Sequence, residues 1–417
     1  MADKTPENVW EKVTKKANIL SDRLKRKGTV LFHRINAFRL PFRDIDVKTA
    51  GKLAVTAAAV LALAAVMISG ADLSPAAIVR GARDKRALSA ASGEGFPFDV
   101  RGSRALSMER VSNGTAVLTD TSCTVLNRDG KEVISETHYM ANPVMKTADR
   151  YILLFDKKAK SYHLCTLSGR ICSGQVDHSI ITGAVSRSGN FALVTKHDTA
   201  NAHVYVFSKA GDVLHKWKSS VYHISDITVS PSGHLIAMCG VAADNDGNLR
   251  SSVIIQKVGG SENLREYVFD GTLMFSVRFA DNDSVIAIGD DLMARVSAGS
   301  EKQLTYGYDG RTLTGFDISD SGSAALALSP HSDGQNASVV VVNASCREVI
   351  SLETALDAPR VELTGNRVNM IGQSRFYSYT LGGKLADAQE IPADGQSVLT
   401  SEGNVLVEGI STITKVR

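Results

Sequence analysis

Hydrophobic and polar residues are arranged in three different ways along the chain, and each arrangement predicts a different structure. Over residues 7–27, apolar residues recur every three or four positions among lysines and arginines, as on an amphipathic helix. Over residues 53–71, only Thr56 and Ser69 have polar side chains. From Phe96 onward, short β-branched apolar runs alternate with Gly, Asn, Asp and Ser, which is typical of an all-β protein.

The uncharged run over residues 53–71 predicts a single transmembrane helix. At about 1.5 Å per residue it spans about 28 Å, close to the roughly 30 Å of a bilayer's hydrocarbon core. A buried globular helix would normally show a polar stripe, which this run lacks. A cleaved signal peptide is the other alternative, but 52 residues precede the run. We therefore predict an uncleaved signal-anchor.

Charge predicts the orientation of this anchor in the cell membrane. Residues 1–52 hold 13 Lys and Arg against 6 Asp and Glu, and basic flanks of a first membrane helix stay in the cytoplasm. The far side carries a smaller basic cluster, Arg80, Arg83, Lys85 and Arg86. We predict a basic cytoplasmic tail (1–52), a single-pass span (53–71) and an extracellular C-terminal domain. The tail's helix suits contact with anionic lipid, and a tail whose charges only set topology is the alternative.

Beyond a small, charged and aperiodic spacer (72–95), one unit recurs: a polar turn followed by an apolar strand. The residues before successive turns lie 35 to 50 positions apart, and repeats near 40 residues with several strands are typical of propeller blades. We predict an eight-bladed β-propeller over residues 96–417. A seven-bladed ring is the alternative, because the markers Ala280 and Thr364 match weakly. The eight markers are Ser112, Thr147, Ser186, Ser230, Ala280, Ser319, Thr364 and Ser401.

The two ends of this domain are predicted to close the ring together. After NVLVEG the chain has room for only one more strand, so the last blade lacks its outer strand. The segment FPFDV, residues 96–100, precedes the first blade and has no other assignment. If it supplies that outer strand, no open edge is left to pair with another chain.

The units VSRSGNFALV and VSPSGHLIAM resemble blades of the WD/PQQ-like propeller superfamily, although they lack the Trp-Asp ending of WD repeats. The whole arrangement resembles an uncharacterised family of Gram-positive bacterial single-pass membrane proteins. That resemblance implies a short basic cytoplasmic tail, one span and an extracytoplasmic propeller. It implies no catalytic residue.

Five cysteines are too few for a disulfide-stapled domain. Cys165 and Cys172 flank a turn that we expect at Ser168-Gly169, which would place the two residues opposite each other across a hairpin. A disulfide and two thiols meeting on a strand face both fit that spacing.

Candidate chemistry is sparse. Asp244 to Asn248 is similar to a calcium loop, but Ile255 stands where a Glu ligand is required, so a hairpin turn is favoured. With only Trp10 and Trp217, a tryptophan-stacked quinone cofactor does not fit. Five histidines match no metal-ligand spacing; we expect scattered surface positions rather than a metal site or a pH-sensitive patch. They are His197, His203, His215, His223 and His234.

No GxSxG, Walker, HExxH or CxxC motif occurs, so we predict no catalytic, cofactor-binding or metal site. Residues 53–417 are mildly acidic, with 34 Lys and Arg against 38 Asp and Glu, which does not suit nucleic acid. We predict a non-catalytic, membrane-anchored platform that binds an envelope protein or a cell-surface polymer. The alternatives are a sensor relaying through the basic tail and, third, a hydrolase. The sequence leaves partner identity and oligomeric state open.

Overall fold

The computed structural model describes residues 93–416, except residues 101, 244, 245 and 355, together with residues 79, 82, 84, 86, 88 and 89. The predicted tail (1–52) and span (53–71) lie outside the described residues. Within the described part of the chain, no helix is long and apolar enough to cross a membrane.

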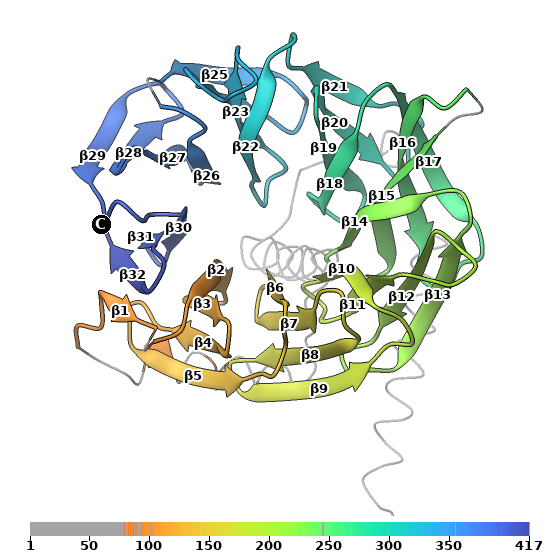
Figure 1. The fold of residues 1–417 in the computed structure, drawn as a ribbon, viewed down its shortest axis with the longest axis horizontal. Coiled ribbons are helices and arrows are strands. Elements are labelled where there is room, and N and C mark those ends of the chain that lie inside the picture. The colour runs from red at the N-terminus through yellow and green to blue at the C-terminus, as the bar shows by residue number, and fades with distance from the viewer. Residues whose placement is uncertain are drawn as a thin grey trace, which may run out of the picture. The chain divides into compact units, whose positions relative to one another are not determined.

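Eight four-stranded antiparallel sheets form a ring of blades around a central channel (Figure 1), which confirms the eight-bladed propeller and excludes the seven-bladed alternative. Blade 1 contains β2 (Ala105–Val111), β3 (Gly114–Thr119), β4 (Ser122–Leu126) and β5 (Glu132–Thr137), and blade 2 contains β6 (Pro143–Ala148), β7 (Tyr151–Asp156), β8 (Ser161–Thr166) and β9 (Gly169–Gln175). Blade 3 contains β10 (Ile180–Val185), β11 (Phe191–Thr195), β12 (Ala202–Phe207) and β13 (Val213–Ser219), and blade 4 contains β14 (His223–Val229), β15 (Leu235–Ala243), β16 (Leu249–Lys257) and β17 (Asn263–Asp270).

The second half of the ring repeats this plan. Blade 5 contains β18 (Met274–Phe279), β19 (Ser284–Gly289), β20 (Leu292–Ser297) and β21 (Leu304–Gly307), and blade 6 contains β22 (Thr312–Ile318), β23 (Ala324–Ser329), β24 (Ser338–Val342) and β25 (Glu348–Glu353). Blade 7 contains β26 (Arg360–Thr364), β27 (Arg367–Gly372), β28 (Arg375–Thr380) and β29 (Leu385–Glu390), and blade 8 contains β30 (Ser397–Ser401), β31 (Asn404–Glu408), β32 (Thr412–Lys415) and β1 (Phe98–Asp99).

The hydrophobic core lies between neighbouring blades. The two middle strands of a blade are covered on both faces, which is why β7 (YILLFD) and β12 (AHVYVF) are apolar almost throughout and fully buried. Outer strands such as β5 alternate instead, with one face toward solvent. Between blades 2 and 3, for example, Phe155 packs in one cluster with Phe191 and Phe207.

The predicted closure of the ring is confirmed. In blade 8, β1 pairs antiparallel with β32, with Phe98 opposite Ile413 and Asp99 opposite Thr412. Blade 8 is also joined to blade 1, because Ser401 Oγ donates a hydrogen bond to the carbonyl of Gly114 at 3.1 Å. The outer strand of the last blade therefore comes from the N-terminal side of the domain.

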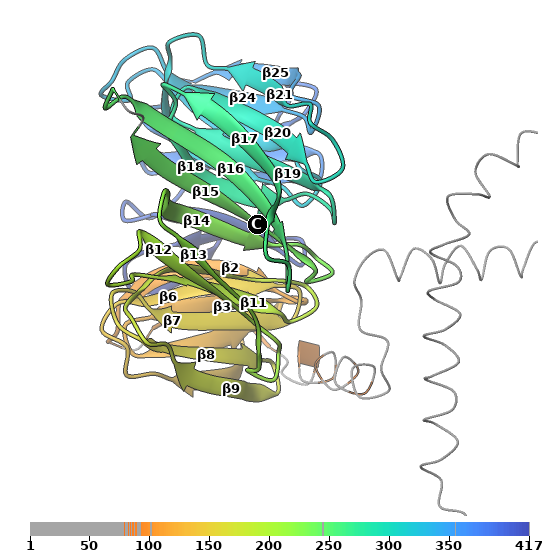
Figure 2. The ribbon, with the colours of Figure 1, turned by 90° about the vertical axis from the view of Figure 1, so that its right-hand side faces the viewer.

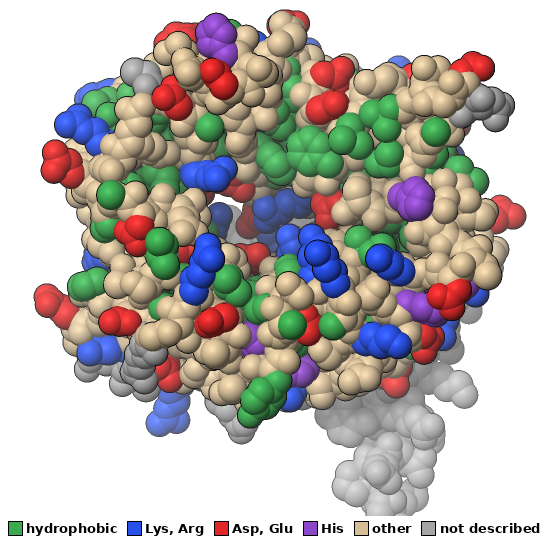
Figure 3. Space-filling model, viewed as in Figure 1, with side chains coloured by type: hydrophobic (Ala, Val, Ile, Leu, Met, Phe, Trp, Pro, Cys, Tyr) green, Lys and Arg blue, Asp and Glu red, His purple; other side chains and the backbone are tan. Residues whose placement is uncertain are grey.

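The ring has two faces, seen edge-on in Figure 2. The front face, shown in Figure 3, carries the loops between second and third strands and the loops that link blades. The back face carries the remaining turns. The segment before β1 lies against the back face: Asn127, between β4 and β5, donates to the carbonyl of Leu88, and Ser168, between β8 and β9, donates to Asp84. Within the predicted spacer, therefore, helical Asp84 and Leu88 contact the ring.

Candidate functional site at the central channel

The innermost strand of each blade lines the central channel (Figure 1). Each of these strands is the edge of its sheet, and an edge strand presents backbone amides and carbonyls that have no partner in the sheet. The channel is therefore where the ring must satisfy its own backbone, and also where a ligand can meet free backbone groups.

Four acidic side chains satisfy such amides, and each links one blade to the next. The carboxylate of Glu109 accepts from the backbone amide of Thr147 at 2.8 Å. The remaining three acceptor–amide pairs are Asp226–Val277 at 3.0 Å, Asp317–Leu363 at 2.8 Å and Glu362–Thr400 at 2.6 Å. We call these four contacts the blade latches.

The latch residues were not among those predicted from the sequence, although a signal for them exists. Each one lies one to three residues before the end of the innermost strand, in MERV, SDITV, FDI and VELT. An acidic residue recurring there in aligned repeats, on a strand that is otherwise apolar or small, could have been noticed. What the sequence could not show is that the partner is an amide of the following blade.

Burial is the main influence on these carboxyl groups. It raises the pKa of Glu109, Asp226 and Glu362 above the usual carboxyl value, because the charged form loses its contact with water. The hydrogen bonds that each latch accepts partly offset this increase in pKa, as does the nearby Lys146 for Glu109 and Asp226. The latches thus function as structural acceptors in a poorly hydrated wall.

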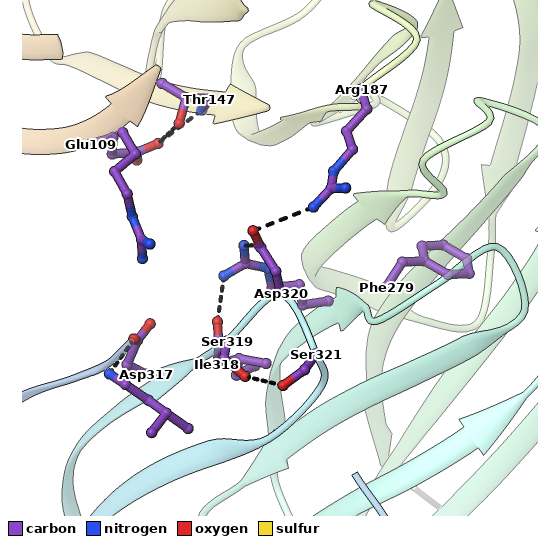
Figure 4. A network of polar contacts seen from close by, with 12 residues as sticks. Glu109, Thr147, Arg187, Phe279, Asp317, Ile318, Ser319, Asp320 and Ser321 are labelled. Carbon is purple, nitrogen blue, oxygen red and sulfur yellow. Dashed lines mark hydrogen bonds and ion pairs between the residues drawn. The ribbon is translucent and has the colours of Figure 1, made fainter. Parts of the chain in front are cut away.

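At the back end of the channel, one carboxylate holds two arginines from different blades (Figure 4). Asp320, in the turn after β22 of blade 6, lies 3.3 Å from Arg187 of blade 3 and 2.7 Å from Arg278 of blade 5. The Arg187–Asp320 pair therefore reaches across the channel. All three side chains are about half-exposed or more, so each pair contributes at most about 1 kcal/mol to stability.

At the front end, the channel wall contains an apolar pocket of about 430 Å³. Its walls come from the beginnings of the innermost strands of blades 5 to 8. Phe275 and Phe316 form its aromatic side, with ring centroids 5.8 Å apart in an edge-to-face arrangement. Arg360 stands exposed at its rim. Figure 3 shows hydrophobic side chains gathered beside the central hollow in the region of β18 and β22. Volume and lining suit a small apolar group.

Gly315 shapes the wall of this pocket. A Cβ at this position would lie 2.9 Å from the backbone carbonyl oxygen of Pro359, which is closer than side chains tolerate. Glycine therefore allows β22 and the start of β26 to approach closely between Phe316 and Val361. This role could not be predicted from the sequence, because the two segments belong to different blades.

The cysteines do not form reactive thiols in this structure. All five are free, and burial raises the pKa of Cys165 to about 12, so its thiolate is scarce near neutral pH. The expected turn at Ser168-Gly169 was wrong by one residue, since Thr166 pairs with Gly169 and the turn is Leu167-Ser168. Together with a bulge at Cys165, this shift places Cys172 opposite Leu164 instead.

The histidines are partly clustered, in contrast to the expected scatter. His197 and His203 lie together, with ring centroids 5.5 Å apart, and the ring centroid of His178, a residue outside the five considered above, is 5.3 Å from that of His197. The remaining three are separate: His215 is buried, while His223 and His234 are exposed. The predicted hairpin turn near Asp246 is confirmed, because the loop joins β15 to β16.

Within the described part of the chain, no group of three or more His, Cys, Asp or Glu is arranged to hold a metal ion. The channel combines an apolar pocket, buried acceptors and exposed arginines. Such features are suited to contacts with another molecule.

The chain belongs to the family described as "Family of unknown function (DUF5711)", which matches residues 98–417. No curated protein sequence matches it. Among solved structures, Sqt1 from Chaetomium thermophilum is 12% identical with a TM-score of 0.53, and 78% of this chain and 98% of that chain are covered. BamB from Moraxella catarrhalis is 8% identical with a TM-score of 0.50, covering 78% of this chain and 96% of that chain. These similarities define the class of the protein as a β-propeller.

Proposed function

We propose that this protein is a non-catalytic platform, anchored in the cell membrane by residues 53–71, whose extracytoplasmic propeller binds an envelope protein at its front face. The observation that carries the proposal is the apolar pocket formed by Phe275, Phe316 and Val361 at the mouth of the channel. The propeller fold supports it as a scaffold that places loops and pockets on one face.

The pocket favours a protein segment with an apolar side chain next to an acidic one. Burying one such side chain contributes about 1.5–3 kcal/mol, or roughly 10- to 150-fold in affinity. Arg360 at the rim can pair with the carboxylate. The segment before β1 lies against the back face, so a partner can reach the pocket without displacing it.

The test is site-specific photocrosslinking of the full chain in its own cells. A photoreactive amino acid replaces Leu313, which lines the pocket, or Leu385, which is 46% exposed on outer strand β29 and serves as the matched control. We expect one discrete adduct from position 313, its loss when Val361→Arg fills the pocket, and no adduct from position 385. The proposal fails if the adduct survives Val361→Arg or forms equally at position 385.

Platform and sensor differ in whether the cytoplasmic tail matters. Replacing residues 1–50 with an unrelated basic tail leaves a platform functional, because such a tail still sets topology. Loss of function in that variant, with the adduct at position 313 intact, identifies a sensor.

A further inference from the structure

Lysines are concentrated in one sector of the ring. Residues 96–417 contain 13 lysines, and seven of them lie from residue 157 to residue 218. Four of these, in the front-face loops of blades 2 and 3, are exposed, and none forms an ion pair with a described residue. We call Lys157, Lys158, Lys160 and Lys196 the lysine sector.

Backbone hydrogen bonds bring these lysines together from separate loops. The amide of Lys158, between β7 and β8, donates to the carbonyl of Ile180 at 2.9 Å, and the amide of Ile180 donates back to Ala159 at 2.7 Å. The amide of Lys196, after β11, donates to the carbonyl of Ser179 at 2.9 Å. The two lysine-bearing loops therefore lie on either side of one short segment that links blade 2 to blade 3.

The acidic residues beside the sector are already engaged. Asp198 pairs with His178 at 3.2 Å, and Asp177 accepts a hydrogen bond from Tyr205 at 2.9 Å. Toward the outer strand, Lys216 lies over the ring of Tyr205 at 5.3 Å and extends the basic surface. The carboxylates therefore leave the four lysine ammonium groups available to an external anion.

The other front-face loops carry more acidic than basic side chains, although Arg104, Arg311 and Arg360 also lie at this face. Its loops outside this sector carry aspartates in blades 1, 5, 6, 7 and 8, so an approaching polyanion is repelled there and attracted to blades 2 and 3. These aspartates are Asp120, Asp290, Asp291, Asp309, Asp333, Asp357 and Asp394.

We propose that the lysine sector of blades 2 and 3 is a binding surface for a flexible polymer that carries repeated phosphate groups. Lysine ammonium groups are compact point charges that donate to phosphate oxygens from any direction, which suits a flexible chain whose charged groups are not held in one geometry. The described front-face loops of this sector contain lysines and no arginine. The lysine sector is separate from the apolar pocket. A test of polymer binding to this sector is therefore independent of the proposed binding of a protein partner to the pocket.

The experiment uses the full chain in nonionic detergent and fluorescently labelled inorganic polyphosphate, with binding followed by anisotropy at low and moderate salt. The test variant is Lys157→Gln/Lys160→Gln/Lys196→Gln. Lys158 is left in place because its backbone is in the left-handed region, with φ 71°, and a change there also changes the turn. The control variant, Lys257→Gln/Lys302→Gln/Lys384→Gln, removes the same charge from exposed positions on the back face.

We expect the test variant to bind at least tenfold more weakly at low salt and the control variant less than twofold more weakly. The plot of log affinity against log salt has a negative slope, and the magnitude of this slope should decrease by about two in the test variant. Three lysines are removed, and each phosphate contact contributes about 0.7 to the slope for a flexible single chain. Thermal melting shows that both variants are folded. Equal weakening by the two variants, no binding by the unmodified chain at low salt, or equally tight binding of a polyglutamate of equal charge each overturns the proposal.

Discussion

The carboxylate of Glu362 in blade 7 accepts two hydrogen bonds from Thr400 in blade 8, one from the backbone amide at 2.6 Å and one from the hydroxyl at 2.7 Å. It also accepts one from the side-chain amide of Asn369 at 3.1 Å. Every neighbour within hydrogen-bonding distance is a donor, and the carboxylate is almost completely buried. This latch therefore depends on having two acceptor oxygens.

Glu362→Gln is expected to destabilise the ring by about 1–3 kcal/mol, because an amide NH₂ replaces one acceptor and leaves a buried donor without a partner. Glu390→Gln, at an exposed position on β29 of the same blade, is the matched control and should change stability by less than about 0.5 kcal/mol. Urea unfolding of both variants measures the difference. Equal stability of Glu362→Gln and the unmodified chain would contradict the structural role of the latch.

Ile413, completely buried opposite Phe98, tests the closure of the ring. Ile413→Ala should lower stability by about 2–5 kcal/mol, as large-to-small changes in a packed core do. Ile410→Ala, 48% exposed in the preceding loop, should have little effect. Deleting residues 410–417 removes β32 and should abolish cooperative unfolding, because β1 and β31 then lose their shared partner. A truncated chain that melts like the full one would show that closure contributes nothing.

Acid is expected to weaken blade 3 through His203. Burial, together with the nearby Lys218, His197 and Lys216, lowers the pKa of His203 to about 4, while Asp177 acts in the opposite direction. The unfolded chain, with a histidine pKa near 6.5, binds the proton first, so stability is present above that pH and is lost as the pH falls toward 4. The slope is at most about 1.4 kcal/mol per pH unit.

His203→Phe should flatten this part of the pH profile, since the residue then no longer titrates. Thermal melting between neutral pH and pH 4 measures the slope, and His331→Gln, at an exposed position, is the control. An unchanged slope in His203→Phe would assign the acid sensitivity to other groups.

The predicted orientation in the membrane can be tested by cysteine labelling in intact cells. A cysteine at Asn8 should be protected from a membrane-impermeant thiol reagent, and one at Ser332, exposed between β23 and β24, should react. Cys172 is changed to serine to remove the partly exposed native thiol. Labelling at position 8 with protection at position 332 would reverse the orientation.

The ring and its closure could be predicted from the sequence because they depend on local patterns. Alternation of apolar and polar residues defines strands, polar turns separate them, and a repeat near 40 residues counts the blades. The strand at Phe98 was identified by elimination, since the last repeat was one strand short. All of this information is carried by residues close together in the chain.

The candidate sites depend on contacts between blades, and a single sequence does not contain that geometry. Glu362 and Thr400, or His178 and His197, have no periodic relation until the ring places them side by side. A small local error also had a large effect: a turn displaced by one residue and a bulge at Cys165 moved Cys172 away from its expected partner.

The pairing of Phe98 with Ile413 also bears on how the protein is made. β1 is synthesised before every other strand of the ring, and its partner β32 is synthesised after every other. Until translation reaches the end of the domain, the nascent chain therefore carries an unpaired strand at its start and an incomplete blade at its end. Incomplete strand edges promote aggregation and recognition by chaperones and proteases. Only a chain synthesised to the end of β32 can close the ring, because a prematurely terminated chain lacks the strand that pairs with β1.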